Sequence, residues 1–283
     1  MMEKDLISII SKVESFPSMP ATAAKVLSLI ENPDVTALEI EKTIKFDAGL
    51  TANILKLVNS AYFGLSTEVG SIKRAIVLLG LKRLVQIVMT SCVNALMDKQ
   101  VIGYDLPPGE LWRHSIAVSV AAEGLVKELD ILVPEEIFTA ALLHDVGKLI
   151  LGEFVKEDIN KIEIKASTGI PFQVAEHEVL GTDHAEIGAH VLMNWSFPSE
   201  IVNAVRWHHD PDAAEKINTL IDIVHIADVL CLMIGIGVGR EGLKYEPSPS
   251  VSKRLGLTYK HLEMIASQTL LWTNELIDVL ESG

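Results

Sequence analysis

One stretch of sequence contains both an apolar helical pattern and side chains able to do chemistry: Ile137-Phe138-Thr139-Ala140-Ala141-Leu142-Leu143-His144-Asp145-Val146-Gly147-Lys148. An apolar run of helical character ends in an imidazole and a carboxylate, and an ammonium group follows one turn after the imidazole. Burying His144 and Asp145 without partners would be unfavourable. We therefore expect a buried helix that reaches a polar cavity at its carboxyl end.

Helical periodicity continues on both sides of this stretch. In almost every segment the apolar residues recur with a period of about 3.6 rather than 2, and aromatic residues make up only 5% of the chain. Both features favour an all-α protein without a sheet. We predict helices over residues 5–14, 21–31, 36–46, 47–59, 72–79 and 81–93, and then over residues 110–128, 134–147, 149–167, 171–180, 183–195, 198–208 and 217–234. A loop over residues 235–258 leads to a last helix that ends near residue 281.

A break in the helical pattern divides the chain into two predicted parts. Gly103, Pro107 and Pro108 interrupt the periodicity within residues 98–109. We predict a helical N-terminal subdomain over residues 1–100 and a second helical subdomain over residues 101–283, which includes the C-terminal helix. A chain of 283 residues is long enough for each part to bury a core.

The charge of the chain limits its partners. A formal net charge of −14 and a pI of about 5.1 oppose binding to nucleic acid or to an anionic membrane, because both need a positive surface. The predicted helix pair around Gly80 has the outline of a helix-turn-helix, with Lys73, Arg74, Lys82 and Arg83 nearby. Such pairs are common in helical domains, so we interpret these basic residues as a solvated face.

Hydropathy does not predict a membrane protein. Mean hydropathy is +0.32, but the most apolar stretch, residues 220–239, carries Asp222, His225 and Asp228, and its uninterrupted part is too short to span a bilayer. The first residues do not resemble a signal peptide. Cys92 and Cys231 lie in apolar helical runs, as is typical of buried thiols in a reducing compartment. We therefore expect a cytoplasmic protein.

The side chains able to do chemistry form one ordered series of carboxylate, imidazole and ammonium groups, all in the second part of the chain. Its members are Glu110, His114, His144, Asp145, Lys148, His184, His208, His209 and Asp228. The dipeptide His-Asp occurs at residue 144 and again at residue 209, so it proves little alone. The spacing and the helical setting of the whole series indicate a site.

Several members have helical positions that suit a shared site. Glu110 and His114 are one turn apart and can hold one cation between them, although such pairs often form only a surface hydrogen bond. His184 falls in the first turn of a predicted helix, and His208 and His209 end another. These positions place imidazole groups at helix ends, where they can converge.

An isolated carboxylate strengthens this interpretation. Asp228 lies within an apolar segment that would exclude it unless it had a strong partner, and a metal ion supplies one. His225, one turn earlier, fits a satisfied core histidine or a residue that orients a ligand better than it fits a ligand. His177, His190 and His261 have no companions, and we interpret them as structural.

The donor set favours particular metals. Imidazole and carboxylate groups without thiolate suit Mn, Fe, Co, Ni or Zn better than Ca or Mg. Two such ions roughly 3.5–4 Å apart, with Asp145 bridging them, would activate a water and hold a phosphate group. Lys148 is placed to contact a phosphate oxygen; alternatively it is a charge that opposes a helix dipole. The arrangement indicates metal-assisted phosphoester hydrolysis, with Asp145 and Lys148 as candidate catalytic residues.

The order of His114, His144-Asp145 and Asp228 on successive helices resembles the HD superfamily of metal-dependent phosphohydrolases. The stretches His144-Asp145-Val146-Gly147-Lys148 and His184-Ala185-Glu186-Ile187-Gly188, the histidine pair at 208–209 and a Glu one turn before the first His are more specifically similar to the HD-GYP cyclic-dinucleotide phosphodiesterases. The chain departs from that group after the pair, because Asp210-Pro211-Asp212-Ala213-Ala214-Glu215 contains no Gly-Tyr-Pro motif.

The N-terminal half resembles a related family more closely. Four motifs carry the resemblance: Phe16-Pro17-Ser18-Met19-Pro20, Lys45-Phe46-Asp47-Ala48-Gly49-Leu50-Thr51, Asn59-Ser60-Ala61-Tyr62-Phe63-Gly64 and Ala75-Ile76-Val77-Leu78-Leu79-Gly80. Together they resemble the HDOD (HD-related output domain) family of bacterial signalling proteins, over about residues 15–235.

The resemblance implies an HD-like helical bundle in the C-terminal half, preceded by a helical N-terminal subdomain. It implies an output function in signal transduction through protein partners. From the charge of the chain we expect neither nucleic acid nor a membrane as a partner. Because the ligands are retained, we expect two or three divalent transition metal ions on Glu110, His114, His144, Asp145, His184, His208, His209 and Asp228. The alternative is a metal-dependent phosphohydrolase or phosphodiesterase that acts on a nucleotide or cyclic dinucleotide, a phosphate-containing small molecule that Asp145 and Lys148 would process.

Overall fold

The computed structural model describes residues 2–30, 32, 34–45, 47–132, 136–242 and 245–281. Within these ranges the regular structure is helical, and the one β-type contact is an isolated bridge between Val101 and Leu106. The predicted all-α class is confirmed. The helices are α1 Met2–Ser15, α2 Ala21–Ile30, α3 Ala37–Ile44, α4 Ala48–Val58, η1 Ala61–Phe63, α5 Ile72–Met97, η2 Ile102–Tyr104, α6 Glu110–Glu128, α7 Ile137–Leu143, α8 Lys148–Ala166, α9 Phe172–Leu180, α10 His184–Asn194, α11 Ser199–Trp207, η3 Pro211–Ala213, α12 Thr219–Met233, α13 Pro249–Arg254 and α14 Tyr259–Glu281.

The chain divides into two compact units that differ from the predicted domains at both ends. Unit 1 comprises Met1–Pro17 and Met97–Leu270, and unit 2 comprises Ser18–Leu96 and Leu271–Gly283. The predicted boundary at residue 100 lies near the boundary at 96–97. The first helix, however, belongs with the C-terminal part, and the last unit boundary falls within α14.

Unit 2 shows how local sequence signals set its helices. The Thr36 side chain accepts a hydrogen bond from the Glu39 amide while the Glu39 carboxylate accepts one from the Thr36 amide, so the predicted capping box begins α3. Asp47 caps α4 by accepting from the Leu50 amide. Gly80 has φ 82° and ψ 169°, which interrupts α5 and confirms the predicted helix pair. The predicted ends at Glu31 and Phe46 lie outside the described residues.

One helix among the described residues, Ile72–Asn94, is long and apolar enough to cross a membrane by length and composition. The break at Gly80 falls inside it. A single helix of this kind is weak evidence, because core helices of other proteins have the same composition. The cytoplasmic location therefore stays a prediction.

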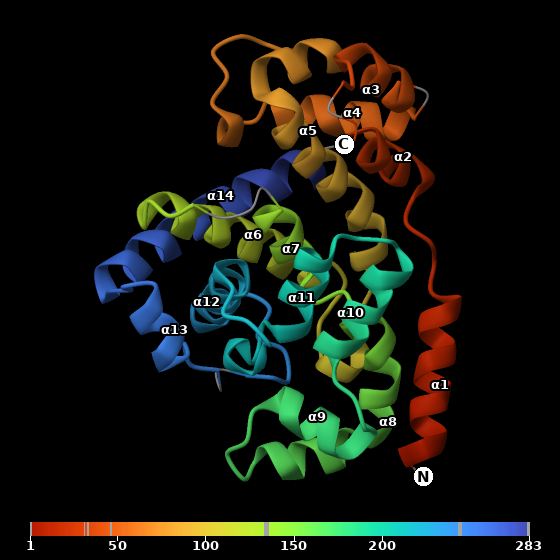
Figure 1. The fold of residues 1–283 in the computed structure, drawn as a ribbon, viewed down its shortest axis with the longest axis vertical. Helices are drawn as coiled ribbons and strands as arrows, with labels where there is room; N and C mark the ends of the chain where they lie inside the picture. Colours follow the sequence, from red (N-terminus) through yellow and green to blue (C-terminus); the bar gives the residue numbers. More distant parts are fainter. Residues whose placement is uncertain are drawn as a thin grey trace. The chain divides into compact units, whose positions relative to one another are not determined.

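Unit 1 is built around apolar helices that surround the predicted site. Helix α6 packs against α7 and α12, α11 packs against α7, α10 and α12, and α8 packs against α9 and α10 (Figure 1). Helix α12 is buried along almost its whole length. Leu142 and Leu143 of α7 are completely buried among these helices. Helices α6, α11 and α12 therefore pack around α7.

Two elements of unit 1 differ from the prediction. Helix α7 ends at Leu143, and His144 to Gly147 form a turn before α8 instead of a continuing helix; the predicted start at Pro134 lies outside the described residues. Helix α13 lies within the predicted loop 235–258. Its signals are Ser248, which caps it by accepting from the Val251 amide, and Pro249 at its first position.

Leu142→Ala will lower the free energy of unfolding of the protein by about 2–5 kcal/mol, because it leaves a cavity at a fully buried position. Chemical denaturation measured by circular dichroism checks this value. Leu132→Ala is the control, since Leu132 is 100% exposed and its loss will change stability by less than about 0.5 kcal/mol. Equal effects of the two variants would contradict this packing of α7.

Candidate metal centre

A turn between α7 and α8 carries the central carboxylate of the site. Gly147 allows this turn to lie against the start of α10, because a Cβ atom at Gly147 would be 2.0 Å from the backbone oxygen of His184 and 2.6 Å from the nitrogen of Gly188. No larger residue fits there without displacing the backbone. The motif that follows His144 thus brings Asp145 close to His184.

Seven of the predicted ligands converge in one buried cluster. Helix α6 supplies His114, the turn supplies His144 and Asp145, α10 begins with His184, His208 and His209 directly follow α11, and α12 supplies Asp228. Their side chains are no more than 3% exposed. Three groups within the cluster have ligand atoms close enough to share a metal ion: Asp145 with His184, His208 and His209; His114 with His144 and Asp145; and His144 with His208 and Asp228.

Four histidines are oriented in the same way. In each of them Nδ1–H donates a hydrogen bond to an acceptor outside the cluster: His114 to the carbonyl of Ile236 at 3.1 Å, His144 to that of Ala141 at 2.7 Å, His208 to that of Val205 at 2.6 Å, and His184 to the carboxylate of Glu176 at 2.7 Å. These bonds fix the tautomer, so that the Nε2 lone pairs point inward. Metal-binding histidines are held in this way.

The inward nitrogens lie too close to one another to be stable without a shared cation. The Nε2 atoms of His184 and His209 are 2.8 Å apart, and those of His114 and His144 are 3.2 Å apart. Two imidazole lone pairs at such distances repel unless a proton or a metal ion lies between or beside them.

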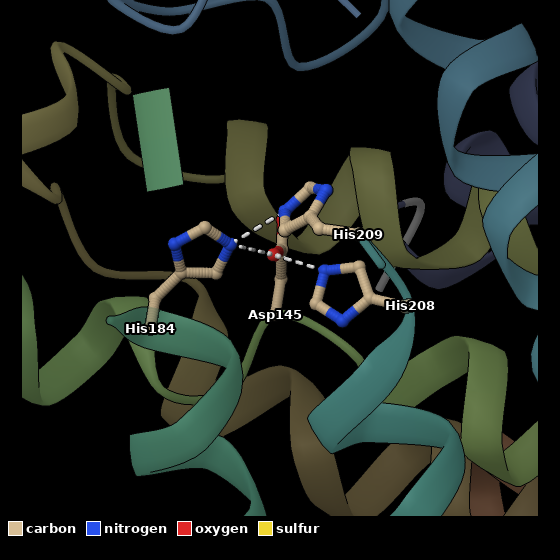
Figure 2. A group of neighbouring side chains, drawn as sticks. All are labelled: Asp145, His184, His208 and His209. Atoms are coloured by element: carbon tan, nitrogen blue, oxygen red, sulfur yellow. Dashed lines mark hydrogen bonds and ion pairs between the residues drawn. The ribbon is translucent and has the colours of Figure 1, made fainter. Parts of the chain in front are cut away.

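Asp145 lies between the two groups of histidines. Its Oδ1 atom is 3.5 Å from His184 Nε2 and 3.9 Å from His208 Nε2, as Figure 2 shows. Its Oδ2 atom is 3.3 Å from His144 Nε2 and 3.5 Å from His114 Nε2. One oxygen faces each group, so Asp145 would contribute one oxygen to each of the two metal-sized groups that contain it.

Buried atoms without hydrogen-bond partners show that the donor set fits metal. Among the described residues, Asp145 Oδ1, His208 Nε2, His209 Nδ1 and Asp228 Oδ2 are buried and accept or donate no hydrogen bond. Unpaired buried polar atoms are costly. Divalent ions would satisfy these atoms, and the mixture of imidazole and carboxylate matches transition metals.

Burial and neighbouring charges raise the pKa of some histidines of the cluster and lower the pKa of others. Burial lowers the pKa of His144, but the carboxylates of Asp145 and Asp228 outweigh it and raise that pKa to about 10. Burial and the neighbouring His144 lower the pKa of His208 to about 3, and burial with His208 also lowers the pKa of His209. Burial lowers the pKa of His184 as well, but the carboxylate of Glu176 outweighs it and raises that pKa to about 9. The lowered pKa values of His208 and His209 keep these two imidazoles neutral and available as ligands.

Two predicted residues lie at the edge of the cluster. Glu110 does not join the metal-sized groups among the described residues; it is half-buried and accepts a hydrogen bond from the Gly237 amide at 3.0 Å. Its role as a ligand stays a prediction. Lys148 is buried, and its Nζ lies 2.7 Å from Asp145 Oδ2. Burial lowers the pKa of Lys148, but Asp145 and Glu241 outweigh it and raise that pKa well above its ordinary value.

Residues that the sequence analysis did not identify support the cluster. Glu176 of α9 is completely buried and orients His184. Tyr245 stacks on His209, with ring centroids 4.7 Å apart. Glu241 forms an ion pair with Lys148 at 2.7 Å. His225, which the sequence suggests is a satisfied core histidine or a residue that orients a ligand, donates a hydrogen bond to the carbonyl of His208 at 2.7 Å.

Comparison with known proteins identifies the family. The family model described as HDOD domain matches residues 16–211. This chain belongs to the HDOD family. The match covers both the N-terminal motifs and the histidine cluster up to Pro211, so the resemblance noted in the sequence is confirmed.

Two individual proteins are similar to this chain in sequence. An uncharacterized protein of Treponema pallidum (strain Nichols) is 30% identical over 225 residues, which are 78% of this chain and 43% of that protein. Ribonuclease Y of Clostridium tetani is 31% identical over 155 residues, 55% of this chain and 22% of the enzyme. The chain therefore spans less than half the length of these relatives.

Solved structures share the fold over nearly the whole chain. An HDOD domain protein of unknown function from Geobacter sulfurreducens is 24% identical, with a TM-score of 0.70 and coverage of 98% of this chain and 95% of that one. A candidate phosphohydrolase from Shewanella amazonensis is 25% identical, with a TM-score of 0.64 and coverage of 92% and 97%.

Glu176→Gln will weaken metal binding about 10- to 100-fold, because the neutral amide oxygen accepts the Nδ1–H bond of His184 more weakly than the carboxylate and makes this imidazole a less basic ligand. Competition with a chromophoric chelator measures the affinity. Glu178→Gln on the same helix is the control, since Glu178 pairs with Lys165 at the surface. An unchanged affinity in Glu176→Gln would show that His184 needs no such support.

Proposed function

We propose that this HDOD protein is a signal-transduction output module whose unit 1 holds two or three divalent transition metal ions. The ligands are His114, His144, Asp145, His184, His208, His209 and Asp228, with Glu110 as an eighth if it turns inward. The convergence of inward-facing Nε2 atoms on the two oxygens of Asp145 supports the metals. In this role the ions stabilise a fold that presents its surface to signalling proteins.

Because the cluster is buried, this conformation favours a role as an output module over a role in catalytic turnover. The ligands are almost inaccessible to solvent, and the ammonium of Lys148 already contacts Asp145 and Glu241. An enzyme needs an open coordination position and an approach for its substrate. A closed metal site instead contributes its binding free energy to folding.

A metal-dependent phosphohydrolase is the second candidate function. Lys148 beside the bridging Asp145 is the observation that favours it, because bound metals would activate water and an ammonium would hold a phosphate oxygen. The relatives named ribonuclease Y and the candidate phosphohydrolase of similar fold agree with this chemistry. Its substrate would be a nucleotide, a cyclic dinucleotide or another phosphodiester.

Elemental analysis of protein purified without a histidine tag tests the metal proposal. The wild-type chain will hold two or three transition metal ions, and Asp145→Asn will lose at least one of them because the bridging charge is removed. The exposed variant Asp210→Asn, beyond the histidine pair, will keep the wild-type content. A wild-type content far below one ion per chain would refute the metal site.

Activity assays on the metal-loaded protein separate the two candidates. Output without catalysis predicts no turnover of nucleotides or cyclic dinucleotides with Mn, Fe or Ni. Turnover that disappears in Lys148→Met would establish the phosphohydrolase instead.

A further inference from the structure

A glycine-rich segment after α12 lies directly on the metal centre. It comprises residues 234–242, which we call the strap. Besides bonds back to α12, its backbone makes three hydrogen bonds to other parts of unit 1: the carbonyl of Ile236 accepts from His114, the amide of Gly237 donates to Glu110, and the amide of Arg240 donates to the carbonyl of Tyr104. At its outer side Arg240 forms an ion pair with Glu163 of α8. These contacts hold the strap closed.

The close packing of the strap depends on glycine residues, which have no side chain. A Cβ atom at Gly237 would be 2.5 Å from the ring of His114, and one at Gly239 would be 2.4 Å from the carbonyl oxygen of Tyr104. Both residues also have positive φ, 75° and 43°. The chain can therefore cover the ligands at van der Waals distance only because it has glycine at these positions.

The strap carries one acidic side chain into the interior. Glu241 is 2% exposed, and its Oε1 atom lies 2.7 Å from Nζ of Lys148, which also contacts Asp145. Apart from this ion pair, neither oxygen of Glu241 has a hydrogen-bond partner among the described residues. Burying a carboxylate there is costly, and the ammonium of Lys148 is the group that compensates it. A carboxylate thus occupies the side of Lys148 at which an oxyanion would bind.

We propose that Glu241 is an internal anion that fills the phosphate position beside Lys148, so that a phosphate-containing ligand binds only when it displaces Glu241 and opens the strap. This inference rests on the proposed metal site and names how access to it is controlled. The ligand class is a phosphate monoester or diester, because a tetrahedral oxyanion can replace the carboxylate against Lys148 and contact the metals on Asp145.

Glu241 is better explained as an anion against Lys148 than as a metal ligand. With Glu176 and His184 it forms a group of metal-binding size. However, Glu176 already accepts the Nδ1–H of His184, and His184 Nε2 faces the main cluster. The positive charge next to Glu241 is the ammonium of Lys148. Metal content of a Glu241 variant distinguishes the two roles.

Binding of inorganic phosphate to the metal-loaded full chain tests the proposal by isothermal titration calorimetry. Glu241→Gln keeps the size of the side chain and removes its charge, so phosphate will bind at least 10-fold more tightly than to the wild type, with unchanged metal content. Glu246→Gln, at an exposed position, will bind phosphate like the wild type. The double variant Glu241→Gln/Lys148→Met will lose the gain.

Three results would overturn the proposal. Phosphate affinity that is equal in Glu241→Gln and in the wild type would show that Glu241 does not occupy the anion position. Loss of metal from Glu241→Gln would assign Glu241 as a ligand. A gain that persists in the double variant would exclude Lys148 as the phosphate contact. If Glu241→Gln fails to fold, Glu241→Asp provides the same test, because its shorter carboxylate leaves Lys148 more weakly paired.

Hydrogen exchange of the wild-type chain tests the opening step. Saturating phosphate will increase exchange at the amides of Gly237 and Arg240, whose hydrogen bonds hold the strap. Phosphate binding without this increase would contradict opening. The experiments distinguish failure of the proposed metal site from failure of this inference. If the metal site is wrong, the wild-type chain will contain no metal. The comparison of phosphate affinities still reports on the roles of Glu241 and Lys148.

Discussion

A carboxylate buried among imidazoles is the constraint on which unit 1 depends. Asp145 is 1% exposed, and no side-chain donor bonds its Oδ1 atom among the described residues. Burial raises the pKa of Asp145, yet His144 and Lys148 hold it well below its usual range, so the group is charged. Such a charge is tolerated only with strong partners. Helices α6, α10, α11 and α12 meet around it, which links helix packing to the ligand set.

This constraint explains why the residues of the cluster could be predicted from the sequence. Asp228 interrupts an apolar helical run and Asp145 follows one, at positions where a carboxylate without a partner would be excluded. His184, His208 and the turn at His144 lie at helix ends. The all-α class and the break at Gly80 were equally predictable, because helical periodicity and glycine conformation are local properties.

The supporting residues could not be found by the same reasoning. Glu176 aligns with Phe172, Ala175 and Leu180 on the buried face of α9, a pattern that could have indicated a buried carboxylate, but its partner His184 belongs to another helix. Glu241 lies in a segment without periodicity. The unit boundaries depend on packing between distant parts of the chain, as in the grouping of α1 with α8 and α10.

A closed strap would reconcile the two proposed functions. The proposed ligands lie together in one cluster, while Glu241 pairs with Lys148 and Gly237 lies against the ring of His114. In this proposal the same centre serves as a folded output module when the strap is closed and receives a phosphate group when it is open. The difference between these states is an exchange of one anion for another at Lys148.

Anomalous diffraction from crystals of the untagged protein, at the absorption edges of Mn, Fe, Co, Ni and Zn, is the decisive test for the proposed metal ions around Asp145. We expect one peak between Asp145 Oδ1 and the group of His184, His208 and His209, and another between Asp145 Oδ2 and the pair His114 and His144. No anomalous density at either position, with the imidazoles bridged by protons or water, would contradict this proposal.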